Sequence, residues 1–206
     1  MNSIQSKTLL LGTTNRKKIV ELRPVLEPLG FRLVDLSSMH NPMDVEETGL
    51  TFIENARLKA AAHAKHYGLH TLGEDSGLCV PGLGGQPGVY SARYAGVGAG
   101  DEANNDKLLQ EMAGLQPEQR AAYYVSTMCL ASPEGDFLIE SEGQCWGRII
   151  ESRRGTGGFG YDPLFEIVEY GQTFAELGLD VKNTLSHRGK AIRQLITQLQ
   201  NLTYVD

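Results

Sequence analysis

The hydrophobic pattern near the start of the chain predicts a strand, a helix and a second strand. Lys7–Gly12 holds a continuous apolar run, which is typical of a buried strand. Asn15 is a favourable helix N-cap, and the apolar residues after it recur with the helical period: Ile19, Leu22, Leu26 and Leu29. Within that helix, Pro24 should cause a kink or a break, and Gly30 should end it. Together with a strand at Phe31–Leu36, this order favours an α/β fold.

A second helix is marked at both of its ends. Thr51 and Glu54 have the spacing of a capping box, and Gly68 is a typical stop signal. The residues expected on its buried face are Ile53, Ala56, Ala60 and Ala64. After this helix, His70–Glu74 is interpreted as a short strand that ends in the turn-forming sequence Asp75-Ser76-Gly77.

The second half of the chain predicts an antiparallel hairpin between helices. A third helix is expected at Asp101–Met112 and a last one after the cap Ser186. Ala121–Ala131 and Phe137–Ile150 have the pattern of two hairpin strands, and Leu164–Val168 follows as a further strand. Combining the hairpin with the opening unit predicts a mixed sheet. No repeat or linker interrupts the chain, so we expect a single domain over residues 1–206.

Composition places the chain among folded proteins with a core of their own. It has 206 residues, of which 41% are hydrophobic and 21% charged, and this composition argues against disorder. The three cysteines lie far apart, which excludes a disulfide framework and a CxxC zinc module and fits a reducing cytoplasm. We expect neither a membrane span nor a secretory signal. The net charge of −6 argues against a nucleic-acid coat but permits a polyanionic substrate in a local basic pocket.

Cations stand at the N-terminal ends of two predicted helices, where acidic side chains are usual. The first helix opens with Arg16, Lys17 and Lys18, and the last opens with His187 and Arg188. Such charges oppose the helix dipole, whereas an anion bound at the same ends would be stabilised by the cations and the free backbone N–H groups together. The alternative is that these are solvated surface charges. Their occurrence on two helices favours anion binding.

Acidic residues form a second candidate cluster. Asp44, Glu46 and Glu47 precede the second helix, and Glu74 and Asp75 end the predicted strand. Brought together, such carboxylates would form a magnesium site completed by phosphate oxygens, and one of them could accept a proton from an attacking water. The alternative is structural, with the two glutamates favouring the helix start and Asp75 forming an Asx turn.

Two further motifs are weak on their own. Gly155–Gly160 matches G-x-G-x-x-G, but it follows no opening strand and starts no helix, which argues against a dinucleotide cofactor. Phe159 in this loop could stack on a planar base or pack inward. A nucleophilic triad of Ser76, His187 and Asp162 is disfavoured because the spacing of a nucleophile elbow is absent.

Taken together, the motifs resemble the inosine/xanthosine triphosphate pyrophosphatase family, whose members remove deaminated purines from the nucleotide pool. The matching blocks span most of the chain and occur in the family's order: Thr13–Lys18, Glu47–Asn55 with Lys59, Glu74–Gly77 running into Pro87–Gly96, Gly157–Pro163, and Lys182 with Ser186–Arg188. Any one of them could arise by chance, but all of them in order are specific. Lys17, where bacterial relatives often have glycine, and Glu74, in place of an aspartate, depart from the pattern.

The resemblance implies an elongated α/β fold with a central twisted mixed sheet, two lobes with a cleft between them, and a homodimer in the cytoplasm. It implies magnesium-dependent hydrolysis of a nucleoside triphosphate between the α and β phosphates. The substrates would be ITP, dITP or XTP. Two alternatives remain open, namely a non-catalytic nucleotide sensor and a phosphohydrolase that acts on modified pyrimidine triphosphates.

The resemblance also assigns roles to individual residues. Those expected to hold the phosphate tail are Thr13, Thr14, Asn15, Arg16, Lys17 and Lys18. Glu47 and Asp75 would bind the metal, with Asp75 also the proton acceptor, and Glu46 or Glu74 remain alternatives for the second ligand. Ser76 would contact substrate. Those expected around the base and sugar are Phe159, Gly160, Tyr161, Asp162, Lys182, His187 and Arg188. Arg188 is a donor suited to the 6-oxygen of a deaminated purine.

Overall fold

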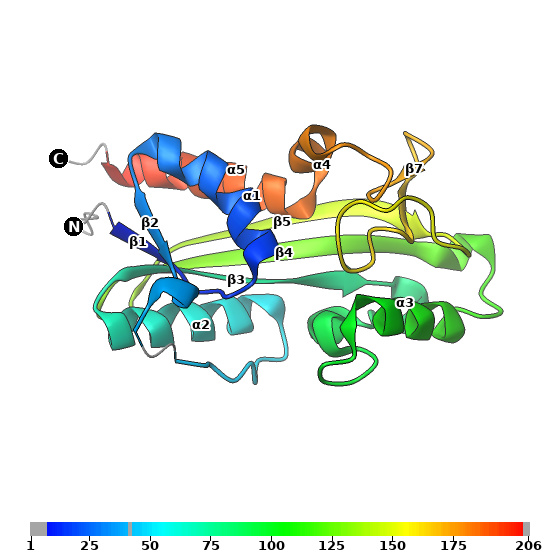
Figure 1. Ribbon diagram of the computed structural model, residues 1–206, viewed down its shortest axis with the longest axis horizontal. Coiled ribbons are helices and arrows are strands. Elements are labelled where there is room, and N and C mark those ends of the chain that lie inside the picture. Colours follow the sequence, from blue (N-terminus) through cyan, green and yellow to red (C-terminus); the bar gives the residue numbers. More distant parts are fainter. Residues whose placement is uncertain (1–7, 41–42, 204–206) are drawn as a thin grey trace. The chain divides into compact units, whose positions relative to one another are not determined.

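The computed structural model describes residues 8–40 and 43–203. The strands in this part of the chain are β1 (Thr8–Leu11), β2 (Arg32–Asp35), β3 (His70–Cys79), β4 (Ala121–Ala131), β5 (Phe137–Ile149), β6 (Phe165–Ile167) and β7 (Gln172–Thr173). Its α-helices are α1 (Arg16–Leu26), α2 (Phe52–Tyr67), α3 (Gly100–Glu111), α4 (Leu179–Leu185) and α5 (His187–Thr203). Figure 1 shows these elements in the colours of the sequence.

The strands form a mixed sheet, as the sequence predicts. Over the described residues the sheet is seven-stranded, in the order β2-β1-β3-β4-β5-β6-β7. β1 pairs in parallel with both β2 and β3, so Leu10 lies opposite Val34 on one side and Thr71 on the other. The pairs β5–β6 and β6–β7 are antiparallel. The predicted α/β class is therefore confirmed.

The chain divides into two compact units, which are described separately. The first holds residues 1–75, 126–143 and 190–206, and the second holds residues 76–125 and 144–189. Strands β3, β4 and β5 and helix α5 each run from one unit into the other. On β3 the change of unit falls between Asp75 and Ser76.

The first unit places helices on both faces of its strands (Figure 1). Side chains of α1 and α5 pack with Leu9, Met128 and Leu130 in one apolar cluster. The alternate residues of β4, Cys129 and Ala131, pack instead with the alanines of α2. This alternation follows from the two-residue period of a strand, and it buries β4 on both faces.

The core of the second unit is built on aromatic and aliphatic side chains. Its buried members come from β3, α3, β4, β5, the segment 161–174 and the loops next to β3 and α3: Leu78, Val80, Tyr94, Leu108, Met112, Ala122, Tyr124, Cys145, Ile149, Tyr161, Leu164, Phe165, Ile167 and Phe174. The rings of Tyr124, Phe165 and Phe174 lie 4.7–5.9 Å apart by their centroids. This packing encloses the chain around Tyr161 and Asp162, which carries several of the predicted base-binding residues.

Several predicted elements have the expected bounds within one or two residues, and others need correction. The capping box of α2 is present, and Gly68 ends the helix in the left-handed conformation with φ 63°. Pro24 does not split α1, which continues to Leu26 before a short 3₁₀ helix, and Leu29 in that 3₁₀ helix is exposed. Neither α4 nor β7 was predicted. Among the described residues, no helix combines the length and the apolar character that crossing a membrane requires.

The largest correction concerns β3. The sequence predicts a strand that ends at Glu74, but β3 runs through Asp75 and Ser76 to Cys79. Polar residues in the middle of a buried strand normally argue for a turn, because each buried polar group needs a partner. Here Glu74 and Asp75 have such partners on neighbouring elements, so the strand can continue. The structure also rules out the Asx-turn alternative for Asp75.

Helix α2 lies against β3 at Gly73 without any intervening side chain. A Cβ at Gly73 would overlap the carbonyl oxygen of Ala56 and come within 2.7 Å of the backbone nitrogen of Ala60. Backbone cannot move aside as a flexible side chain can, so glycine is required for this close approach. The contact fixes how near α2 comes to the strand that carries Asp75.

We expect Gly73→Ala to lower the free energy of unfolding by about 1–3 kcal/mol, the usual cost of overpacking a core. The measurement is chemical denaturation of the two proteins under the same conditions. Gly178→Ala is the control, because nothing lies within 4 Å of the added Cβ, and its change should stay within about 0.5 kcal/mol. Equal stability of Gly73→Ala and the wild type would contradict the close contact.

Candidate active site

The residues directly before α1 cap the N-terminal end of this helix. The Asn15 side chain caps the helix by accepting hydrogen bonds from the backbone nitrogens of Lys17 (3.0 Å) and Lys18 (3.4 Å). The hydroxyl of Thr13 in turn accepts a bond from the Asn15 backbone nitrogen at 3.1 Å. Arg16 is exposed, as the solvated-charge alternative expects. The loop is therefore shaped before any ligand arrives, with N–H groups at the first turn.

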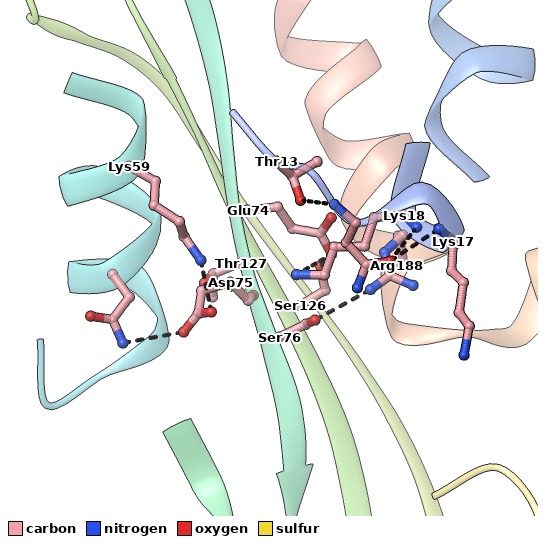
Figure 2. Close-up of polar contacts among 12 residues, drawn as sticks. Thr13, Lys17, Lys18, Lys59, Glu74, Asp75, Ser76, Ser126, Thr127 and Arg188 are labelled. Carbon is pink, nitrogen blue, oxygen red and sulfur yellow. Dashed lines mark hydrogen bonds and ion pairs between the residues drawn. The ribbon is translucent and has the colours of Figure 1, made fainter. Parts of the chain in front are cut away.

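Lys18 differs from the cations before it because its side chain is largely buried. It is 13% exposed, and its Nζ lies 4.0 Å from Oε1 of Glu74. Ser126 on β4 donates a hydrogen bond to the same Glu74 oxygen at 2.9 Å. Figure 2 shows Lys18, Glu74 and Ser126 together. Lys18, at the predicted cationic start of the first helix, thus contacts Glu74, the first of the two acidic residues on β3.

Asp75 meets a different set of partners from its neighbour. Because side chains alternate along a strand, Glu74 and Asp75 point to opposite faces of β3. Nζ of Lys59, on α2, lies 3.0 Å from Oδ1 of Asp75 and 2.6 Å from Oε1 of Glu47 (Figure 2 shows the contact with Asp75). Glu47 and Asp75 thus both contact the same lysine nitrogen. Glu46 is exposed, and Glu74 contacts Lys18 on the other face.

Burial dominates the electrostatics of this group. Removal from water raises the pKa of Asp75 above its ordinary value, and Glu47 adds to the rise, while Lys59 and Lys18 act against it. For Lys59, burial by itself would lower the pKa, but Asp75 and Glu47 outweigh it and the pKa of the ammonium rises. The lysine therefore stays charged at neutral pH. Asp75 is a stronger base than an exposed aspartate.

The second unit gathers another set of predicted residues around Asp162. Oδ2 of Asp162 accepts a hydrogen bond from the backbone nitrogen of Phe159 at 2.8 Å and lies 2.6 Å from Nζ of Lys182. Lys182 Nζ is also 4.7 Å from the centre of the Phe159 ring. A buried ion pair thus holds the loop that carries Phe159. Tyr161 is buried in the core, where its hydroxyl donates to the Ser91 carbonyl oxygen at 2.8 Å.

Helix α5 begins with residues that are enclosed rather than solvated. Arg188 is 1% exposed and His187 is 5% exposed, so the solvated-charge alternative is wrong for this helix. The His187 ring stacks on Tyr124 with centroids 4.7 Å apart. Nη2 of Arg188 donates to the Ser76 hydroxyl at 3.2 Å (Figure 2), and its guanidinium lies 5.8 Å from the centre of the Phe159 ring. The start of α5 thus brings the Arg188 guanidinium, a strong donor, close to both the Ser76 hydroxyl and the Phe159 ring.

Sequence reasoning gave no role to several residues that build these sites. Asn55 and Lys59 are buried on α2, one helical turn apart, beside the alanine stripe. A polar residue repeated at i and i+4 next to an apolar stripe is a detectable signal that this face meets a polar partner. Tyr124, in contrast, lies in an apolar strand and gives no such signal.

Comparison with known proteins identifies the family of the chain. The sequence profile of the Ham1 family matches residues 9–198. The chain belongs to the Ham1 family. It is 50% identical over 194 residues to the dITP/XTP pyrophosphatase of Rhodopirellula baltica, covering 94% of this chain and 93% of that protein. The dITP/XTP pyrophosphatase of Thermus thermophilus is 49% identical over 193 residues, covering 94% of this chain and 92% of that protein.

Solved Ham1 structures share the fold. This Ham1-family chain matches the HAM1 protein of Coxiella burnetii with a TM-score of 0.87 and 36% identity, covering 94% of this chain and 98% of that one. The Ham1 protein of Staphylococcus aureus gives a TM-score of 0.86, also at 36% identity, with the same coverage of 94% and 98%. The expected α/β fold of the family is therefore confirmed for this chain.

We expect Lys59→Met to lower the free energy of unfolding by about 3–5 kcal/mol near neutral pH, because Glu47 and Asp75 would lose the cation between them. Burial already raises the pKa of Asp75, and loss of Lys59, which acts against that rise, lifts the pKa further above its unfolded value. The penalty should then be small below about pH 4, where the carboxyls are protonated in the unfolded chain as well, and should grow as the pH rises. Denaturant unfolding at several pH values measures it. A penalty that does not depend on pH would contradict the pairing.

Proposed function

We propose that the chain hydrolyses the triphosphates of deaminated purines, namely dITP, ITP and XTP, to the monophosphate and pyrophosphate. The observation that carries the proposal is the meeting of Glu47 and Asp75 at Lys59, in the unit that also contains the capped start of α1. The relatives named dITP/XTP pyrophosphatases, which match nearly the whole chain, support the same reaction.

The proposal includes magnesium. Among the described residues, no group of three or more His, Cys, Asp or Glu side chains is arranged to hold a metal ion. Mg²⁺ in phosphate-transfer sites is commonly held by one or two carboxylates plus substrate phosphates, so Glu47 and Asp75 fit it as oxygen donors. These two residues would hold the ion, which would neutralise phosphate charge and polarise oxygen. Binding of the magnesium ion should depend on the bound triphosphate.

Each residue in the first unit then has a definite task. Lys18 and the positive end of the α1 dipole would neutralise the phosphate tail as the pyrophosphate leaves. Asp75 would accept the proton of the attacking water. The water oxygen bonds to phosphorus, and the bond between the α and β phosphates breaks. Thr13, Thr14, Arg16 and Lys17 stay predicted phosphate-binding residues.

The second unit would select the base. A deaminated purine has an acceptor oxygen at position 6, whereas adenine has a donor amine there. A donor such as Arg188 therefore pairs with hypoxanthine or xanthine and would be left unpaired by adenine. Phe159 supplies a ring for stacking. Gly160, Ser76, Lys182 and His187 belong to the same proposed pocket.

Asp75→Asn tests the proton acceptor. Because the amide cannot take a proton from water, we expect kcat to fall by about 100-fold or more. The amide keeps the size of the side chain, so nucleotide binding should remain measurable by calorimetry. Near-normal turnover in this variant would contradict the role of Asp75.

Asp162→Asn tests the base-binding unit. Losing the charged partner of Lys182 and of the Phe159 nitrogen should raise KM for dITP by about 10- to 100-fold, with kcat changed far less. The matched control is Glu166→Gln, which removes another buried carboxylate, paired with Arg148 and Arg154, away from this loop. That control should lose stability but keep its KM. A KM that rises equally in both variants would contradict the assignment.

A panel of nucleoside triphosphates separates the proposed function from its rivals. Pyrophosphate and orthophosphate are measured separately with dITP, XTP, dATP, dGTP and a modified pyrimidine triphosphate in the presence of Mg²⁺. Pyrophosphate from dITP and XTP supports the proposal. Binding without product would indicate a sensor, and preference for the pyrimidine would indicate the other phosphohydrolase.

The assembly and the location of the protein stay predictions. The homodimer implied by the family resemblance would need a surface to bury. A groove of about 710 Å³ over α2, lined by Leu50, Leu58 and Phe137 among others, offers one. Leu50 is 81% exposed. Sedimentation of the purified protein tests the dimer, and fractionation of the host cell tests the cytoplasmic location.

A further inference from the structure

Asn55 is a fully buried polar residue to which the resemblance assigns no role. It lies on α2 with 0% exposure, one turn before Lys59. A buried amide costs free energy unless its oxygen and nitrogen both find partners. In this protein the two partners are the loop that carries Glu47 and the carboxylate of Asp75.

The orientation of the amide follows from its first partner. The backbone nitrogen of Gly49 lies 2.8 Å from Oδ1 of Asn55. A backbone N–H can only donate, so the atom that faces it must be the amide oxygen. The amide nitrogen is then turned toward Asp75, and its Nδ2 lies 3.3 Å from Oδ2 of that residue. An amide nitrogen can only donate, so the Asp75 oxygen opposite it must accept.

Asp75 is thereby held through both of its oxygens. Lys59 contacts Oδ1 at 3.0 Å, and Asn55 donates to Oδ2 at 3.3 Å. Thr127 on β4 donates to the Asp75 backbone carbonyl at 3.4 Å. Two side chains from one helix thus fix the rotation of the carboxylate about its own axis.

The loop that carries Glu47 is tied to the same helix. Besides the Gly49 bond to Asn55, the backbone nitrogens of Leu50 and Thr51 donate to Oε2 of Glu54 at 2.8 and 3.0 Å. Glu47 stands only two residues before Gly49. A Cβ on Gly49 would lie 2.7 Å from Oδ1 of Asn55, so the loop and the amide meet without room for a side chain.

We propose that Asn55 is a positioning residue that sets the relative placement of Asp75 and the Glu47 loop for the hydrolytic step. Its amide links the Asp75 carboxylate to the backbone of the loop that carries Glu47, without itself touching the nucleotide. This inference rests on the proposed function, because it takes Asp75 as the proton acceptor. A misplaced proton acceptor slows the chemical step, while nucleotide binding by α1 and the second unit is unaffected.

The test uses substitutions that keep the branched shape of the side chain. Asn55→Asp retains an acceptor for the Gly49 nitrogen but places an oxygen where the donor to Asp75 was. Asn55→Leu removes both bonds. We expect kcat for dITP with Mg²⁺ to fall by about 10- to 100-fold in each, with KM within about threefold of the wild-type value.

Asn104 on α3 provides a matched control. It is 3% exposed, its Oδ1 accepts from the Ala95 nitrogen at 2.8 Å, and its Nδ2 donates to the Ala92 carbonyl at 3.3 Å. It therefore clamps a loop as Asn55 does but contacts no carboxylate. Asn104→Asp and Asn104→Leu should lower the melting temperature as the Asn55 variants do, yet keep kcat. An equal fall of kcat in both series would mark a general loss of structure and overturn the proposal.

Gly49→Ala gives a second route that leaves Asn55 in place. The added methyl pushes against the amide oxygen, so kcat should fall while KM is retained. A kcat within twofold of wild type in folded Asn55→Asp overturns the inference. Loss of folded protein in all Asn55 and Gly49 variants also overturns it, because it would mark a structural role. If the wild type itself releases no pyrophosphate from dITP, the proposed function fails instead.

Discussion

The fold of the first unit depends on a buried lysine placed between two carboxylates. Lys59 and Asp75 are buried and Glu47 is partly exposed. Taking a charged group out of water costs several kcal/mol, and this cost is offset only when the groups meet in good geometry. Lys59 meets both Glu47 and Asp75 within 3.0 Å, so the cluster is tolerated inside the protein. The same burial that makes the cluster costly raises the pKa of Asp75. One physical cause, burial, thus sets both the energetic cost of the cluster and the basicity of Asp75.

The close contact between α2 and β3 fixes the distances between Lys59 on the helix and Asp75 on the strand. Gly73 lets the α2 backbone contact β3, and the small alanine side chains of α2 keep the helix close to the sheet. Long side chains from the helix can then reach Asp75 without bending away. A bulkier interface would move Lys59 and Asn55 outward together, and both bonds to the carboxylate would be lost.

Much of the fold could be predicted from the sequence because its signals are local. The capping box of α2, the hairpin β4–β5 and the parallel opening unit all follow from periodicity and turn chemistry. The course of β3 could not be predicted, because local rules treat Asp75-Ser76-Gly77 as a turn. What keeps it extended is Lys59 and Ser126, which are distant in sequence. Local signals in the sequence do not distinguish Glu47 from Glu46 as the partner of Asp75; only the family resemblance favoured Glu47.

Glu74 and Asp75, adjacent in the chain, face opposite sides of β3 and have separate cationic partners, Lys18 and Lys59. Inserting one residue upstream in this strand would move Glu74 into the place of Asp75, on the face of Lys59, and Asp75 one position further along, onto the face of Lys18. Each cation would keep an acid on its own face, so the charges alone discriminate weakly against the shifted register. The longer glutamate would then stand where Asp75 now contacts Asn55 and Lys59. The alignment of β3 with β1 therefore decides which acid occupies this place, and apolar packing rather than charge must enforce it.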